Sequence, residues 1–152
     1  MPIIMPTSQA CAFCEYLAER RPYTILERGD LVAILVTQEQ RGKGHLLVIP
    51  IAHRPTLLDL DPGEDREMMD ALRRAAKAIA KTYDPDGISV WQNNGVTAHQ
   101  SIPHCHFHVA GTIDDGGTEW GNVPELNIAE TDRISDALLL HLPPPRPNDQ
   151  NM

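Results

Sequence analysis

Three histidines at alternate positions constrain the local fold more than any other feature of this chain. His104, His106 and His108 are separated by single residues, and an apolar run follows them. On a β-strand successive side chains point to opposite faces, so the three imidazoles would share one face. The segment 104–112, HCHFHVAGT, is therefore predicted to be a strand that carries a row of imidazoles.

The rest of the chain combines short β-rich runs with two helical patterns, which makes α+β the predicted fold class. Apolar residues recur at helical spacing over 64–83, behind a capping pattern in which Asp61 precedes Pro62. A shorter helix is expected at 129–140, and the turn pair Gly29-Asp30 predicts a hairpin. The other predicted strands are 23–28, 31–37, 45–51 and 88–92.

Length and composition predict one domain followed by a short tail. The chain has 152 residues, 41% of them hydrophobic, which suits one domain with a real core. We assign this domain to residues 1–142. Residues 143–152 contain four prolines and are expected to form a solvated, disordered tail, because proline fixes φ and lacks an N–H donor.

Charge and hydropathy exclude several classes of partner. The formal net charge is −8 and no run of Lys or Arg is longer than a pair, so neither polymeric nucleic acid nor an anionic membrane is an expected partner. No apolar run approaches the roughly 18 to 20 residues that cross a bilayer, and the N-terminal residues do not resemble a signal peptide. A cytoplasmic location is therefore expected, with reduced cysteines.

A row of imidazoles is compatible with two kinds of chemistry. Neutral imidazole is a good metal ligand, so a three-histidine zinc hydrolase is one possibility. It is also a good nucleophile near neutral pH, so covalent catalysis at phosphorus is the other. The alternative without catalysis is a polar strand face that binds divalent metals nonspecifically.

Four segments of the chain together resemble one protein family. The alternating HCHFHVA at 104–110 follows GHLLVIP at 44–50 and NNGVTAHQSIPH at 93–104, and CAFC at 11–14 precedes them all. This order and spacing are similar to those of the histidine triad (HIT) superfamily of nucleotide hydrolases and transferases, in its zinc-bearing, Hint-like branch. The resemblance covers about residues 11–112. It implies a mostly antiparallel sheet of about five strands, with the long helix packed on it, and a homodimer.

The resemblance also implies roles for the three histidines. His106 would be the nucleophile and would form a covalent nucleotidyl-imidazole, while the carbonyl of His104 orients its other ring nitrogen. His108 would bind and polarise the phosphate. The implied function is hydrolysis of a phosphorus bond in a nucleoside phosphoramidate or polyphosphate. Alternatives are transfer of the nucleotidyl group to an acceptor, as in a phosphorylase, and a nonenzymatic nucleotide-binding zinc protein.

The segment 93–103 would supply the remaining substrate contacts. By resemblance, Gln100 and Ser101 would contact phosphate oxygens and the leaving group, with Asn93 beside the phosphate. His99 stands where the family commonly has glycine, and would bring a titratable side chain close to the phosphate. Each of these polar residues is also suited to a turn without any role in binding.

Two cysteines and two histidines are predicted to bind zinc. The spacing of Cys11 and Cys14 indicates metal or redox chemistry in a reducing compartment. Together with His53 and His104 they would make a Cys₂His₂ set, which is typical of closed, structural zinc sites. The alternative is a metal-free pair of thiols. A thioredoxin-like role fits less well, because no βαβ pattern surrounds the cysteine pair.

Overall fold

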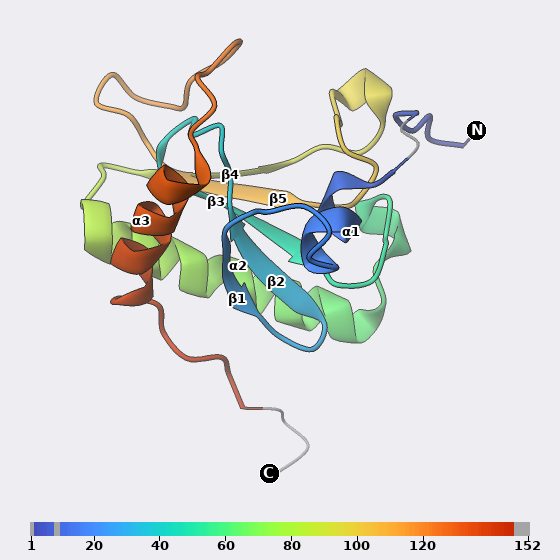
Figure 1. Ribbon diagram of the computed structural model, residues 1–152, viewed down its shortest axis with the longest axis horizontal. Coiled ribbons are helices and arrows are strands. Elements are labelled where there is room, and N and C mark those ends of the chain that lie inside the picture. The colour runs from blue at the N-terminus through green and yellow to red at the C-terminus, as the bar shows by residue number, and fades with distance from the viewer. Residues whose placement is uncertain (1, 8–9, 148–152) are drawn as a thin grey trace.

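A hairpin begins the sheet at the turn that the sequence predicts. The computed structural model describes residues 2–7 and 10–147, and Gly29 N–H closes the turn by donating to Val32 O at 2.8 Å. Every neighbouring pair of described strands is antiparallel, in the order β1-β2-β3-β5-β4. The α+β prediction with five strands is confirmed (Figure 1). The strands are β1 (Ile25–Arg28), β2 (Val32–Val36), β3 (Lys43–Pro50), β4 (Ile88–Gln92) and β5 (Phe107–Gly111).

One face of the sheet is covered by the long helix α2, which spans Pro62–Tyr83 (Figure 1). Its apolar stripe packs against Leu46, Val48 and Val109, all fully buried. The predicted capping pattern is present, because Glu64 Oε1 accepts the N–H of Asp61 at 2.8 Å. Asp84 ends the helix in the left-handed conformation. The helix was predicted at 64–83, so the sequence located it to within two residues.

The opposite face of the sheet is only partly covered, by the short helix α1 (Ala12–Leu17). Phe13 and Leu17 are buried there against Leu35 and Leu47. This helix is not predicted from the sequence, because six residues are too few to show a period of 3.6. Beyond α1, the histidine side chains lie on the part of this face that no helix covers.

A third helix, α3 (Ile128–Leu139), packs beside β1, β2 and α2, close to the predicted 129–140. Asn127 caps it by accepting the N–H of Glu130 at 2.9 Å. Two short 3₁₀ turns, Leu57–Asp59 and Val96–Ala98, lie in the loops after β3 and β4. No helix in the described part of the chain is long and apolar enough to span a bilayer.

The strand predicted at 104–112 is shorter in the structure, which is a correction to the sequence analysis. β5 begins at Phe107, and the two preceding histidines, His104 and His106, lie in the segment that enters the strand. The reason is that Cys105 N–H donates to Arg54 O at 2.6 Å, in the loop after β3, and so does not pair with a strand. The segment bends there, which turns the first imidazole away from the others.

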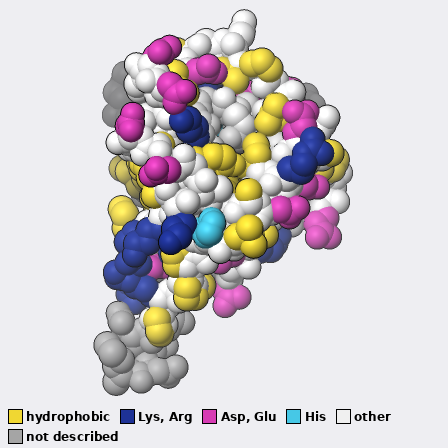
Figure 2. Space-filling view, turned by 90° about the vertical axis from the view of Figure 1, so that its left-hand side faces the viewer, with side chains coloured by type: hydrophobic (Ala, Val, Ile, Leu, Met, Phe, Trp, Pro, Cys, Tyr) yellow, Lys and Arg dark blue, Asp and Glu magenta, His cyan; other side chains and the backbone are white. Residues whose placement is uncertain are grey.

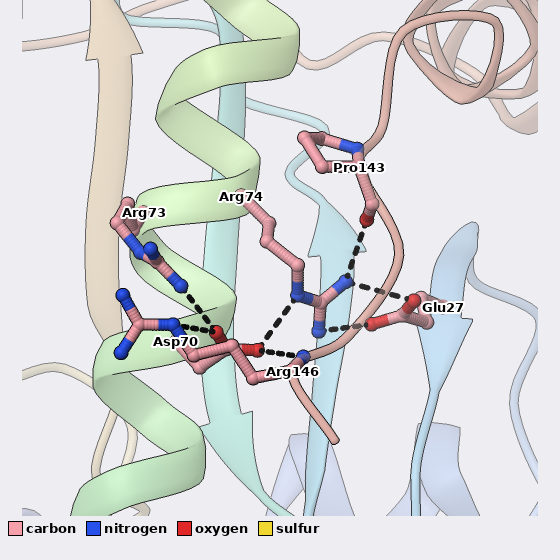
Figure 3. A network of polar contacts seen from close by, with 6 residues as sticks. All are labelled: Glu27, Asp70, Arg73, Arg74, Pro143 and Arg146. Atoms are coloured by element: carbon pink, nitrogen blue, oxygen red, sulfur yellow. Dashed lines mark hydrogen bonds and ion pairs between the residues drawn. The ribbon is translucent and has the colours of Figure 1, made fainter.

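A buried arginine ties the C-terminal segment to the helical face (Figure 3). Arg74 binds both carboxylate oxygens of Glu27 at 2.9 and 2.8 Å, and its Nε donates to Asp70 at 2.9 Å. Pro143 O and the backbone N–H of Arg146 extend the network at 3.4 Å each. Described residues of the predicted tail thus contact α2 and have no regular secondary structure. The rest of that tail, 148–152, lies outside the described residues.

A groove of about 660 Å³ runs beside this network, between the β1–β2 turn, α2 and residues 145–147. Figure 2 shows Lys and Arg side chains gathered at the lower left of the molecule in that view. The negative charge of the acidic side chains nearly balances the positive charge of the arginines in the groove. We therefore interpret the groove as a structural contact between α2 and the C-terminal segment. The charged lining residues are Arg28, Arg66, Arg73, Arg74, Arg146, Glu27, Asp30, Glu67 and Asp70.

Candidate active site and metal centre

The ring of His104 is held by a backbone carbonyl, which decides which of its nitrogens can bind a metal. Its Nε2 lies 2.8 Å from Pro50 O, at the end of β3. A carbonyl only accepts, so Nε2 carries the proton and Nδ1 keeps its lone pair. That lone pair faces the sulfurs of Cys11 and Cys14, at 3.4 and 3.6 Å. The imidazole is therefore in the tautomer of a metal ligand.

His106 is held in the opposite tautomer. Its Nδ1 lies 2.7 Å from the carbonyl oxygen of His104, so Nδ1 is the donor and the lone pair is on Nε2. The ring is buried and packs edge-to-face against Phe13, with centroids 5.1 Å apart. A neutral imidazole with a free Nε2 lone pair is the form that can attack phosphorus.

Two successive hydrogen bonds fix the tautomer of His108, and the first of them starts at the backbone N–H of Arg41. The N–H of Arg41 donates to Nδ1 of His45 at 3.1 Å, so neutral His45 carries its proton on Nε2. That Nε2 lies 3.0 Å from Nδ1 of His108. His108 Nδ1 is thus an acceptor and its Nε2 a donor. The rings of His106 and His108 lie 5.0 Å apart, which places a nucleophile beside a donor.

Burial keeps these imidazoles neutral. It lowers the pKa of His45 to about 3, of His104 to about 4 and of His108 to about 2, from an ordinary value near 6.5. Neighbouring positive charge, including Arg41 beside His45 and His108, acts in the same direction. The pKa of His106 is also lowered by burial. At neutral pH the site therefore holds an uncharged nucleophile.

These buried neutral histidines should make the protein less stable in acid. Below about pH 6.5 the unfolded chain takes up protons that folded His45 and His108 do not, so stability is fully present above that pH and falls below it. At pH 5 each such histidine lowers the free energy of unfolding by about 2 kcal/mol. We expect the urea midpoint to fall between pH 7.5 and pH 5.

Two substitutions separate the buried histidines from the general effect of acid. His108→Asn removes one buried imidazole and should make the change in unfolding free energy with pH shallower. His141→Asn alters an exposed histidine and should leave the wild-type slope unchanged. Equal slopes for wild type and His108→Asn would show that His108 is not held neutral by the fold.

The loop 93–103 brings the four predicted substrate-binding residues to the entry of β5, but uses two of their side chains internally. Both amide atoms of Gln100 are engaged: Oε1 accepts from Gly95 N–H at 2.7 Å, and Nε2 donates to Pro55 O and Ile102 O. The amide of Asn93 donates to Ala98 O. Ser101 and His99 are exposed. The first two brace the loop, and the last two are accessible to a ligand.

Gly95 shows how closely the N-terminal segment is packed against this loop. Its φ is +93°, and an added Cβ would lie 2.5 Å from Cγ2 of Ile3. Val96 N–H also donates to Ile4 O at 2.8 Å. A side chain at Gly95 would therefore strain the backbone and push the N-terminal segment away. His99 also has a positive φ, of 67°, in the left-handed region where glycine is otherwise favoured.

The four predicted metal ligands come together from three separate segments. One ligand atom from each of Cys11, Cys14, His53 and His104 lies within 4.8 Å of all the others. Cys14 Sγ is 3.3 Å from His53 Nδ1. Tetrahedral zinc bonds of about 2.0 to 2.3 Å require ligand separations of roughly 3.3 to 3.8 Å, so the residues fit such an ion. Two thiolates with two imidazoles favour zinc over calcium or magnesium.

His45 is a site residue that the sequence analysis missed. It is almost fully buried at the start of β3, and β3 pairs with β5. In the sequence it is 63 residues from His108, and a lone histidine before an apolar strand has no local partner that marks it as functional. The available signal was that His45 is a polar residue two positions before Leu47. It therefore lies on the same face of β3 as Leu47, which pairs with His108 on β5.

Comparison with known proteins identifies the family. A family description, the HIT domain, matches residues 19–114. The chain is 36% identical over 107 residues to adenosine 5'-monophosphoramidase HNT1 of Saccharomyces cerevisiae, covering 70% of this chain and 65% of that protein.

Solved structures share the fold. A Hit-like protein from Bartonella henselae superposes with a TM-score of 0.79 at 22% identity, covering 88% of this chain and 97% of that one. A Zn-bound histidine triad family protein from Mycobacterium smegmatis gives 0.72 at 25% identity, covering 88% and 96%. The resemblance found in the sequence is confirmed, and the chain belongs to the HIT family.

Proposed function

We propose that this protein is a nucleotide hydrolase that cleaves a phosphorus bond through a covalent nucleotidyl-His106 intermediate. The observation that carries the proposal is the tautomer of His106, whose Nδ1–H is bound to His104 O and whose Nε2 lone pair is therefore available. The relative named as an adenosine 5'-monophosphoramidase supports a nucleoside phosphoramidate as substrate. A nucleoside polyphosphate has the same reacting group.

The reaction would proceed in two displacements. Nε2 of His106 attacks phosphorus as the bond to the leaving group breaks, and His108 Nε2–H donates to the oxygen or nitrogen that gains charge. The phosphorylated ring is positive, and its Nδ1–H remains bound to the carbonyl of His104, which stabilises that charge. Water then attacks phosphorus, loses its proton to solvent, and releases His106 as the neutral ring, while His108 Nε2–H continues to donate to the phosphoryl group.

The loop 93–103 would hold the phosphate. Ser101 and His99 are exposed and free to bind phosphoryl oxygens, whereas Asn93 and Gln100 would act by fixing the shape of the loop. Of the four residues that the sequence suggested for substrate binding, two would thus contact the ligand by side chain. The other two would act by holding the loop in place.

Zinc would be a structural ion. Cys11, Cys14, His53 and His104 make a complete tetrahedral set with no position left for water or substrate, so the metal would supply a cross-link and no reaction step. That cross-link would fix α1, the loop after β3 and the entry to β5. Since the carbonyl of His104 orients His106, the metal would stabilise the backbone next to the nucleophile.

The open edge of the sheet supports a homodimer. β4 pairs only with β5 among the described strands, and its Ile88 and Val90 side chains are 37% and 52% exposed. An exposed apolar edge strand is a surface that pairs with another chain. An apolar groove of about 400 Å³ lies between the loop after β3, α2 and the start of β5. The groove is lined by Leu57, Leu60, Asp65, Met68, Met69, Leu72 and Phe107.

A single charge on this edge should separate the subunits. We expect light scattering to give twice the chain mass of 16.9 kDa for wild type, and the chain mass itself for Val90→Lys. The reason is that a buried, unpaired ammonium at a two-fold interface is strongly unfavourable. Leu140→Lys, at an 80% exposed position after α3, should remain dimeric. A wild-type monomer, or a dimeric Val90→Lys, would contradict the β4 interface.

The chemistry is tested by weighing the intact protein after brief incubation with nucleotides. The panel contains a nucleoside phosphoramidate and a dinucleoside polyphosphate. We expect one added nucleoside monophosphoryl group on part of the protein, and a nucleoside monophosphate as final product. If phosphate in the buffer gave a nucleoside diphosphate as the main product, the protein would be a phosphorylase. No adduct and no turnover with any member would exclude the proposed function.

A further inference from the structure

Trp91 lies flat against one of the three triad imidazoles. Trp91 and His108 are Cα partners across β4 and β5, so their side chains leave the sheet on the same face. Their ring centroids are 4.7 Å apart and their planes differ by 4°. The ring of His45 completes the group, with its centroid 5.1 Å from that of Trp91 and 5.2 Å from that of His108. We call these three residues the stacked cluster.

The two contacts of His108 constrain different motions of its ring. The hydrogen bond from His45 Nε2 fixes the position of Nδ1 and prevents a half-turn of the ring, which would replace Nδ1 by a carbon. It does not fix the tilt of the ring, because χ2 of histidine has a broad minimum. A parallel aromatic face does restrict tilt, since tilting would break the stacking contact. Only with both contacts is the direction of the Nε2–H bond determined.

We propose that Trp91 is a positioning residue for the reaction, whose indole fixes the ring plane of His108 and thereby aims Nε2–H at the phosphoryl group attacked by His106. This inference rests on the proposed function. It adds a residue outside the row of histidines and outside the loop 93–103. Catalysis by preorganised donors depends on such alignment, because a donor that must reorient during the reaction stabilises the transition state less.

Among the groups around His108, Trp91 is the one placed to fix its ring plane. The groups that face His108 from neighbouring elements are His45, His106 and Arg41. His106 meets it edge-on, with planes at 64°, and His45 is tilted by 44°. Neither of these rings lies parallel to the ring of His108, so neither can restrict its tilt by stacking. Among the described aromatic contacts of His108, the indole is the only parallel one.

Two substitutions distinguish a flat face from simple space filling. Trp91→Phe keeps a flat ring and Trp91→Leu does not, although both are smaller than tryptophan. We expect Trp91→Phe to retain kcat within about threefold. Trp91→Leu should lower kcat about 10- to 100-fold with little change in KM, because the lost alignment matters in the transition state. Leu140→Thr, at an 80% exposed position after α3 and outside the stacked cluster, should leave kcat unchanged.

A second measurement follows the ring of His108 without any substrate. In the zinc-loaded full chain with ¹³C- and ¹⁵N-labelled histidine, NMR should show His108 with an acceptor Nδ1, and relaxation of its ring nuclei should show a ring as ordered as the backbone of β5. We expect the Phe variant to keep that ordered ring and the Leu variant to have a mobile one. Should the Leu variant fail to fold, Trp91→Met, which is flexible and apolar, takes its place.

The two measurements together decide the proposal. A Leu variant that keeps both its kcat and an ordered His108 ring would overturn it. Equal losses of kcat in the Phe and Leu variants with His108 ordered in both would also overturn it, because side-chain volume would then be the cause. Were wild type inactive on every nucleotide tested, the proposed function would fail, whereas the NMR comparison would still decide whether Trp91 positions His108.

Discussion

His106→Ala is expected to abolish nucleotide turnover while leaving the fold in place. Without Nε2 there is no group in the site that can form the nucleotidyl intermediate, so kcat should fall about a thousandfold or more. The fold should tolerate the change, because His106 makes one side-chain hydrogen bond, to His104 O, and two described ring contacts, with Phe13 and His108. His106→Gln, which fills more of the space, is a second variant for the same test.

The measurement combines steady-state turnover with intact mass, so that slow turnover and loss of the intermediate are separated. His141→Ala is the matched control, since its histidine is exposed and lies in the turn after α3. It should turn over substrate and form the adduct like wild type. Turnover by His106→Ala within a few-fold of wild type would rule out covalent catalysis by this residue. Adduct formation on that variant would place the nucleophile elsewhere.

The fold was largely predictable because its signals are local. The Gly29-Asp30 turn and the cap at Asp61 each depend on residues within a few positions, and the structure has both. β5 was predicted too long, because nothing in HCHFHVAGT reveals that Cys105 N–H pairs with Arg54 O. That bond joins residues 51 positions apart, and tertiary contacts of this kind override strand alternation.

The protonation and hydrogen bonding of the site residues were less predictable than which residues form the site. The sequence suggested all three histidines and the four residues of the metal cluster. The structure brings the metal cluster together and places the rings of His106 and His108 side by side, while the ring of His104 belongs to the metal cluster. Their tautomers depend on distant partners, such as Pro50 O for His104 and Arg41 N–H by way of His45. The side-chain amide of Gln100 is likewise held by Pro55 O, in the loop after β3. Such partners become visible only once the chain is folded.

Replacing Cys11 and Cys14 together by serine should remove the zinc and lower the thermal stability. We expect about one zinc ion per chain in wild type and none in the double variant, because serine is a poor zinc ligand. Burial raises the pKa of the Cys14 thiol to about 11, so a cation is needed to hold it as thiolate at neutral pH. Loss of this cross-link between α1, His53 and His104 should lower Tm by about 10 °C or more.

The third cysteine provides the control for this experiment. Cys105 is buried and lies outside the cluster, so Cys105→Ala should retain its zinc. The metal is measured by elemental analysis of protein purified without an affinity tag, because a histidine tag would itself bind zinc. Equal zinc in wild type and the double variant would place the ion elsewhere, and a metal-free wild type would leave Cys11 and Cys14 as a pair of thiols. A double variant that loses zinc but keeps full turnover would show that the backbone at His104 orients His106 without help from the metal.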